Sequence, residues 1–207
     1  VEGALSGCDD GELFLEYKQS EALAWDDGRL KSASFDTSQG FGLRAVSDES
    51  TGYAHASELS EAAIKRASDT VQSVRQGRSG TMADGPTGTN QSLYIDDNPL
   101  NDVPFGEKVK LLEEIDAYAR SSDDRVRQVS ASLAGSWQVV EILRADGSRA
   151  GDVRPLVRFN VSVVLGEGDR QETGSFGTGG RTLYADYLKP ESWKAAIDEA
   201  MRQADVN

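Results

Sequence analysis

Short stretches of alternating polar and apolar residues dominate the first part of the chain. Such alternation is typical of strands with one buried face. It predicts strands over residues 12–17, 22–25, 29–35, 40–47 and 52–56. The pair Asp27-Gly28 lies between two of these stretches, and Asp-Gly in this position is a strong short-range signal for a β-hairpin.

The same alternation returns in the second part of the chain. It predicts strands over residues 125–133, 137–143, 153–165 and 171–176. Gly135, between the first two, is a point where the chain is expected to kink. Asp146-Gly147 predicts a second hairpin. The stretch 153–165 is the most strand-like of all, and its apolar residues on one face are Val157, Phe159, Val161 and Val163.

Three segments have apolar residues every three or four positions, which is the spacing of an amphipathic helix. The predicted helices run from Ser57 or Ser60 to about Gln76, over residues 105–120, and over residues 190–204. The last two helices have strongly apolar faces, so one of them is a candidate to pack against sequence beyond this chain. That arrangement would leave an apolar patch exposed.

Residues 78–104 differ from both blocks, because they are rich in Gly, Pro, Thr, Asn and Asp. We expect a first β-rich unit with a helix over residues 1–77, a linker or surface excursion over 78–104, and a second α+β unit over 105–207. Both units follow one plan of a hairpin, two further strands and a helix, a pattern consistent with internal duplication. Strands joined by tight turns favour an α+β fold of antiparallel sheet units with helices packed on one face.

The composition is that of a globular protein with an acidic surface. Of 207 residues, 38% are hydrophobic, and 35 acidic against 22 basic side chains give a formal charge of −13. Such a surface repels phosphate backbones, so no nucleic-acid partner is expected. The sequence has no apolar stretch of the roughly 20 residues that span a membrane and no signal-peptide pattern at its start. No membrane partner is expected, and the predicted location is the cytoplasm.

The single cysteine and the single histidine offer little chemistry. Cys8 has only acidic neighbours, so it is expected to be a flexible terminal thiol without a reactive role. His55 is predicted to lie on a short strand between two alanines, where a packed or surface role is commoner than metal binding. Aspartate pairs such as Asp26-Asp27 lack the ligand spacing of a calcium loop. No catalytic or metal-binding residue is therefore assigned in this chain.

Several longer motifs occur in a fixed order along nearly the whole chain. In the first block they are Glu12–Tyr17 (ELFLEY), Asp27–Ser32 (DGRLKS) and Gln39–Val46 (QGFGLRAV). In the second block they are Lys108–Arg120 (KVKLLEEIDAYAR), Val129–Trp137 (VSASLAGSW), Val153–Val164 (VRPLVRFNVSVV) and Glu172–Gly177 (ETGSFG). In this order and spacing the chain resembles the amino-terminal half of the TldD/PmbA family of zinc metallopeptidases, once named modulators of DNA gyrase.

The resemblance implies a peptidase that cleaves unstructured peptides together with a TldE/PmbA-like partner subunit or a second copy of itself. In the family, zinc is held in the carboxyl-terminal half by a His-Glu-x-x-x-His motif and a later ligand, and no position here matches that motif. The resemblance therefore implies a non-catalytic amino-terminal domain that shapes the substrate channel and assists dimer assembly, with zinc in a carboxyl-terminal domain absent from this chain. The alternative is a standalone binding or regulatory module without peptidase activity.

The glycine-rich segment 174–181 is the local candidate for contacting substrate. Its glycines follow a β-run and do not lead into a clear helix, so it fits neither a phosphate loop nor a dinucleotide fingerprint. It is either a flexible hairpin or bulge, or a loop bordering a peptide channel in which glycine allows close backbone approach. In the second case Arg181 would hold a substrate carboxylate or carbonyl. The channel candidates are Phe176, Gly177, Thr178, Gly179, Gly180 and Arg181.

Sheet edges offer a second route to peptide binding. A peptidase that takes extended peptides can pair their backbone with an unpaired strand edge. The stretch 153–165 or the strand that follows it is expected to provide that edge.

Overall fold

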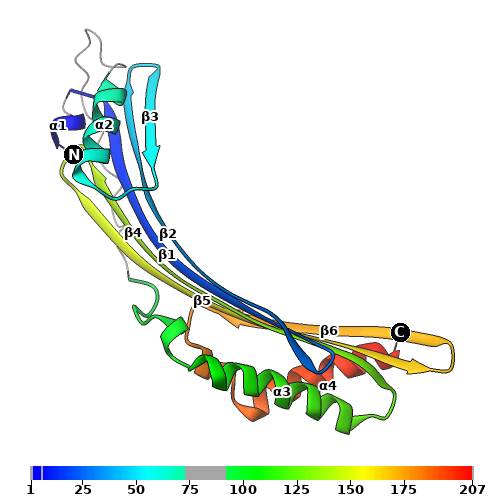
Figure 1. Cartoon of the computed structure of the whole chain (residues 1–207). Helices are drawn as coiled ribbons and strands as arrows, with labels where there is room; N and C mark the ends of the chain where they lie inside the picture. Colours follow the sequence, from blue (N-terminus) through cyan, green and yellow to red (C-terminus); the bar gives the residue numbers. More distant parts are fainter. Residues whose placement is uncertain (1, 6, 73–91, 207) are drawn as a thin grey trace. The chain divides into compact units, whose positions relative to one another are not determined.

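The computed structural model of the protein describes residues 2–5, 7–72 and 92–206 (Figure 1). Its strands are β1 Asp10–Asp26, β2 Arg29–Ser47, β3 Ser50–Ala56, β4 Val126–Arg144, β5 Arg149–Glu167 and β6 Arg170–Gly180. Its α-helices are α1 Glu2–Leu5, α2 Glu61–Val71, α3 Phe105–Ser122 and α4 Pro190–Val206, and its short 3-10 helices are η2 Pro99–Asn101 and η3 Tyr184–Asp186. The predicted α+β class is confirmed.

The six strands form one antiparallel sheet in the order β3-β2-β1-β4-β5-β6. Each sequence block supplies three neighbouring strands, and β1 and β4 meet in the middle. The Asp27 N–H donates to the Val129 carbonyl at 2.9 Å, and the Ala145 N–H donates to the Gly11 carbonyl at 3.1 Å. Since residue numbers rise along β1 where they fall along β4, these two strands are antiparallel. The predicted common plan of the blocks is present with three strands in each instead of four.

The strands are fewer and longer than predicted. The expected strands 12–17 and 22–25 are both part of β1, 29–35 and 40–47 are both part of β2, and 125–133 and 137–143 are both part of β4. Polar runs between these stretches interrupt the apolar alternation but not the backbone, because β1, β2 and β4 are held by hydrogen bonds to neighbouring strands. β4 also continues through Gly135, where a Cβ would lie 2.4 Å from the Tyr184 hydroxyl, so glycine there makes room for Tyr184.

Both predicted Asp-Gly hairpins are confirmed. Asp27 and Gly28 form the two-residue loop between β1 and β2, with φ angles of 48° and 83°. Two positive φ angles define the type I′ turn, whose twist matches that of the flanking strands. In the turn between β4 and β5, Gly147 has a φ of 82°. The Asp146 carboxylate accepts a hydrogen bond from the Ser148 N–H at 2.8 Å, which stabilises this turn.

Contacts divide the chain into two compact units. Unit 1 consists of Val1–Lys18, Thr37–Leu93 and Gln138–Val153, and unit 2 consists of Gln19–Asp36, Tyr94–Trp137 and Arg154–Asn207. β1, β2, β4 and β5 each contribute residues to both units.

In unit 2, helices α3 and α4 cover one face of the strands. The core between them is formed by Leu112 and Ile115 of α3, Trp193 and Ile197 of α4, and Val161 and Val163 of β5. The apolar faces of the two predicted helices are thus covered within this chain, contrary to the expectation that one packs on sequence beyond it. α4 approaches β6 so closely that a Cβ on Gly174 would lie 1.9 Å from the Ala200 carbonyl oxygen.

Unit 1 has a smaller core beneath helix α2, which packs against β3. The Ser60 hydroxyl accepts a hydrogen bond from the Ala63 N–H at 3.1 Å, so Ser60 is the N-cap and decides between the two predicted starts. The helix ends at Val71, and the predicted continuation from residue 73 to Gln76 lies outside the described residues.

The beginning of the chain differs from the expectation. Helix α1 was not predicted, and it places Leu5 in the core of unit 1. Cys8 is only 3% exposed and belongs to the same core. The prediction of a flexible terminal thiol is therefore wrong, because Cys8 packs as a small apolar side chain.

The linker expected over residues 78–104 lies partly outside the described residues, which resume at 92. Residues 92–98 have no helix or strand and are followed by η2. Leu100 of η2 is buried in the core of unit 2, and the Trp137 indole N–H donates to the Asp96 carbonyl at 3.0 Å. These contacts attach the end of the segment to unit 2. None of the helices in residues 2–5, 7–72 and 92–206 has the length and apolar content needed to cross a bilayer.

Candidate functional site

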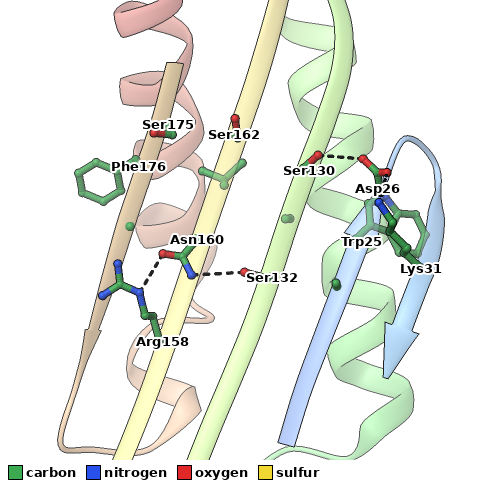
Figure 2. Close-up of a pocket in the computed structure, with 14 residues that line it drawn as sticks. Trp25, Asp26, Lys31, Ser130, Ser132, Arg158, Asn160, Ser162, Ser175 and Phe176 are labelled. Atoms are coloured by element: carbon green, nitrogen blue, oxygen red, sulfur yellow. Dashed lines mark hydrogen bonds and ion pairs between the residues drawn. The ribbon is translucent and has the colours of Figure 1, made fainter. Parts of the chain in front are cut away.

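The face of the unit 2 sheet opposite α3 and α4 is polar, and we call it the open face. Alternation along β5 produces it, because residues next to Phe159 and Val161 in sequence point away from the helices. The open face holds a shallow depression of about 530 Å³ (Figure 2). Its lining includes Ala24, Asp26, Lys31, Ser130, Ser132, Arg158, Asn160, Ser162, Ser175 and Gly177.

Hydrogen bonds connect polar side chains of β4 and β5 across this face. The Arg158 Nε–H donates to Asn160 Oδ1 at 2.9 Å, and Asn160 Nδ2 donates to the Ser132 hydroxyl at 3.3 Å (Figure 2). These bonds orient the Arg158 guanidinium through its Nε and leave its two terminal nitrogens outside the pair. Within the part of the chain that the structure describes, no carboxylate forms an ion pair with Arg158.

Asp26 is the acidic group of the open face. Its carboxylate accepts hydrogen bonds from Gln128 at 2.9 Å, from the Ser130 hydroxyl at 2.9 Å and from Lys31 at 3.0 Å. The hydrogen bond from Gln128, followed by those from Lys31 and Ser130, lowers the pKa of Asp26 to about 2. Asp26 therefore remains ionised at neutral pH and neutralises Lys31.

The titration of Asp26 provides a test of this arrangement. Because the folded-state pKa lies below the unfolded value of about 3.9, the hydrogen bonds to Asp26 contribute stability above that value. This contribution is lost as the pH falls toward 2. We expect a carboxyl ¹³C NMR titration of the folded protein to give a midpoint near 2 for Asp26. In Gln128→Ala the midpoint should rise toward the ordinary aspartate value, and an unchanged midpoint would contradict the assignment of the cause.

The structure places the predicted channel candidates along one edge strand and just after it. Phe176 and Gly177 both line the depression, but only Gly177, which pairs with Asn160, faces the open side, since Phe176 pairs with the buried Val161. Thr178 pairs with Phe159 in the β5–β6 register and so lies on the helix side of the sheet. Arg181 follows β6, where its guanidinium donates to the Pro155 carbonyl at 3.5 Å and lies 5.3 Å from the centre of the Tyr94 ring. Only two of the six candidates therefore meet at the depression, and their role in substrate binding stays a prediction.

Each glycine of this segment lies against a different neighbouring group, which leaves no room for a side chain. A Cβ on Gly177 would lie 2.6 Å from Asn160 Oδ1, one on Gly179 would lie 2.4 Å from the Val157 carbonyl, and one on Gly180 would lie 2.5 Å from the Tyr187 hydroxyl. The segment is a regular edge strand, not a flexible hairpin or bulge. Glycine there allows close approach of neighbouring groups, as the sequence suggested, but those groups belong to this chain.

Sequence reasoning missed the polar residues of the open face. Arg158, Asn160 and Ser162 alternate with the apolar residues that predicted the strand. The same alternation was therefore the signal that could have assigned them to a shared surface. Ser130 and Ser132 of β4 carry a weaker version of this signal, because their strand alternates less regularly.

A second polar cluster lies on the helix side of unit 2. Lys108 of α3 is 1% exposed, donates to the Leu100 carbonyl at 3.1 Å and forms an ion pair with Glu21. Its ammonium lies 4.5 Å from the centre of the Tyr184 ring. Burial, with a smaller effect of the Glu21 carboxylate, raises the pKa of Tyr184 above its ordinary value. The cluster holds α3 and η3 against β1, and its members Glu21 and Lys108 also line a groove of unit 2.

The structure shows no grouping suited to a metal among residues 2–5, 7–72 and 92–206. No three His, Cys, Asp or Glu side chains of these residues come together. His55 lies on β3, where its ring stacks on Tyr53 with 5.6 Å between centroids. The described residues therefore do not fit a zinc ion.

Comparison with models of protein families shows the family to which the chain belongs. The model of the PmbA/TldA metallopeptidase central domain matches residues 98–207, and the model of the PmbA/TldA metallopeptidase domain 1 matches residues 11–73. The chain belongs to the PmbA/TldD metallopeptidase family. The family motifs of Val129–Trp137 and Val153–Val164 thus lie on β4 and β5, the two strands that supply most of the open face.

Curated relatives agree with this membership of the PmbA/TldD family. The chain is 37% identical over 177 residues to the metalloprotease TldD homolog of Haemophilus influenzae, covering 84% of this chain and 36% of the relative. It is 33% identical over 181 residues to the metalloprotease TldD homolog of Buchnera aphidicola subsp. Schizaphis graminum, covering 87% and 38%. The chain therefore spans less than half the length of these relatives.

Solved structures show the same fold at low sequence identity. A putative modulator of DNA gyrase from Thermotoga maritima superposes with a TM-score of 0.76 at 14% identity, over 95% of this chain and 44% of that one. TldE from Thermococcus kodakarensis gives a TM-score of 0.74 at 13% identity, over 99% and 45%. These similarities extend over both units of the PmbA/TldD-type chain.

Proposed function

We propose that this chain is the non-catalytic amino-terminal part of a zinc metallopeptidase that cleaves unstructured peptides, and that its edge strand β6 guides those peptides. The matched family models are domain 1 and the central domain, which supports an amino-terminal position. The observation that carries the guiding role is the position of β6 at the end of the sheet, beside the polar open face.

β6 is a suitable strand for pairing with a peptide backbone. The other strand considered, β5, lies between β4 and β6, so both of its edges are already paired. β6 pairs with β5 from Arg170 to Gly180 and has no described strand on its outer side. Its outward N–H and C=O groups can hydrogen-bond an extended peptide without reading the peptide's side chains. Such pairing fits a peptidase whose substrates share only an unfolded backbone.

In this proposal the zinc ion is bound by a part of the protein other than the residues that the structure describes. When bound, zinc supplies a polarised water for peptide hydrolysis. The role of this chain is to bind the peptide, because its open face offers hydrogen-bonding side chains beside an edge strand. Its residues take no part in the cleavage step.

Assembly with a TldE/PmbA-like subunit or with a second copy, and a cytoplasmic location, are part of the same proposal. Phe35 is 58% exposed and Phe105 is 54% exposed, and both line a groove of about 480 Å³ in unit 2. Exposed large apolar side chains beside a groove are typical of interaction surfaces. They support a protein partner for this part of unit 2.

Hydrogen–deuterium exchange of the chain with an unstructured peptide tests the guiding role. We expect the peptide to slow exchange of amides in Arg170–Gly180, because backbone pairing removes them from solvent. Amides of β3, the other edge of the sheet, serve as the internal control and should not change. A peptide of the same sequence with N-methyl groups on alternate residues should bind at least about tenfold more weakly, since it has lost backbone donors.

Two results would refute the proposal. Equal affinity for the methylated and unmethylated peptides would exclude backbone pairing. Chelator-sensitive cleavage of the peptide by this chain with added zinc would exclude a non-catalytic role. The standalone-module alternative predicts that peptide binding persists in a full-length protein that shows no zinc-dependent cleavage.

A further inference from the structure

The guanidinium of Arg158 lies over the edge strand β6, although Arg158 belongs to β5. In the register Arg158 is opposite Gly179, yet a Cβ on Gly177 would lie only 3.0 Å from Arg158 Nη2. The side chain therefore extends from β5 across the open face toward β6 (Figure 2). This position is possible because Gly177 has no side chain to occupy it.

Asn160 holds the guanidinium in this position. The bond from Arg158 Nε to Asn160 Oδ1 is 2.9 Å long, and Asn160 is in turn bonded to Ser132. Nη1 and Nη2 keep their donors for another group. A planar guanidinium fixed at Nε presents these two nitrogens as a fork that matches a carboxylate.

Several arginines of unit 2 form ion pairs with carboxylates of this chain, namely Arg120, Arg125, Arg170 and Arg202. Among the described residues Arg29, Arg127 and Arg181 form no such pair, but unlike Arg158 they do not line the depression on the open face. Lys31, the other cation that lines the depression, is paired with Asp26. Arg158 has no such partner among residues 2–5, 7–72 and 92–206. On a chain with a formal charge of −13, an oriented arginine without a carboxylate partner indicates a site for an external anion.

We propose that Arg158 binds a carboxylate of the peptide that pairs with the outer edge of β6. This inference rests on the proposed function, because the peptide must lie along β6. Neighbouring strands are about 4.8 Å apart, so a peptide on this edge presents alternate side chains to the open face within reach of a guanidinium over Gly177. The carboxylate comes either from an acidic side chain of the peptide or from its free carboxyl terminus.

Fluorescence anisotropy with labelled peptides of one unstructured sequence tests the inference. The neutral form has an internal glutamine and an amidated carboxyl terminus, the acidic form replaces the glutamine by glutamate, and the free form restores the terminal carboxylate. We expect the acidic form, the free form or both to bind the chain about tenfold more tightly than the neutral form. Which form gains affinity identifies the source of the carboxylate.

Variants assign the preference to Arg158. In Arg158→Gln the three peptides should bind with the same affinity, and Arg158→Lys should keep only part of the preference because it loses the fork. The matched control Arg202→Gln makes the same charge change on α4, where Arg202 is paired with Glu199, and should retain the full preference. Circular dichroism verifies that each variant is folded, and Arg158→Lys gives the answer if Arg158→Gln is not.

The outcomes separate the two proposals. If all three peptides bind the unsubstituted chain equally, or if Arg158→Gln and Arg158→Lys both keep the full preference, the carboxylate site is refuted while the peptide-guiding role stands. If no peptide form binds at all, the peptide-guiding role fails and the carboxylate site fails with it.

Discussion

The variant Lys108→Met is expected to lose about 3–5 kcal/mol of unfolding free energy, the usual cost of removing one partner from a buried ion pair. Lys108 is 1% exposed, and its partner Glu21 is 10% exposed. Without the ammonium, the Glu21 carboxylate and the Leu100 carbonyl lose a donor in a site that water does not reach freely. Urea unfolding followed by tryptophan fluorescence measures the loss as a lower midpoint at unchanged slope.

Two further variants show that burial of the charge causes this effect. Lys110→Met lies on the same helix, but Lys110 is 73% exposed and its pair with Glu114 is a surface pair. Its unfolding free energy should change by less than about 0.5 kcal/mol. Adding Glu21→Gln to Lys108→Met should recover part of the loss, because the buried charge is then gone. A Lys108→Met protein as stable as the unsubstituted chain would show that the pair is not buried in solution.

The variant Gly174→Ala is expected to cost about 3 kcal/mol, near the upper end of the range for overpacking. The new Cβ would lie 1.9 Å from the Ala200 carbonyl oxygen and 2.5 Å from the Ala204 backbone nitrogen. Both atoms belong to the backbone of α4, so no side-chain rotation relieves the clash. Moving α4 would in turn withdraw Trp193 and Ile197 from the core. Thermal unfolding followed by far-ultraviolet circular dichroism measures the destabilisation.

Gly151→Ala is the matched control for Gly174→Ala. Gly151 lies on β5, and a Cβ there would find its nearest neighbour, the Val140 carbonyl, at 3.9 Å. Its unfolding midpoint should stay close to that of the unsubstituted chain, since this is ordinary van der Waals contact. Equal midpoints for Gly151→Ala and Gly174→Ala would mean that α4 does not lie against β6 as described.

Elements that depend on neighbours in sequence were predictable. The two hairpins follow from Asp-Gly pairs that accept positive φ angles, as the 48° and 83° of Asp27 and Gly28 show. Helices α3 and α4 follow from apolar spacing, and their predicted ranges differ from the observed ones only at the carboxyl-terminal ends. The polar open face was predictable in the same way, since Arg158 and Asn160 alternate with the apolar residues of β5.

Elements that depend on distant partners were not predictable. The polar run within β1 looks like a break, but β1 lies between two neighbouring strands that continue its hydrogen bonding. Cys8 looks like part of a loose terminus until Leu5 and the core of unit 1 surround it. Lys108 looks like one more charge on an amphipathic helix, because its partner Glu21 lies 87 residues away.

The sequence by itself determined the α+β class, the family, the helix faces and the hairpin turns, because these depend on local periodicity, turn chemistry and ordered motifs. Only the tertiary structure decided which strands are the edges of the sheet and which cation is buried in an ion pair. It also decided which arginine lies over Gly177 without a carboxylate partner among the described residues. The reason is that strand order and side-chain neighbours are set by contacts between residues far apart in sequence. Periodicity reveals which residues share a face, but it does not reveal what lies opposite them.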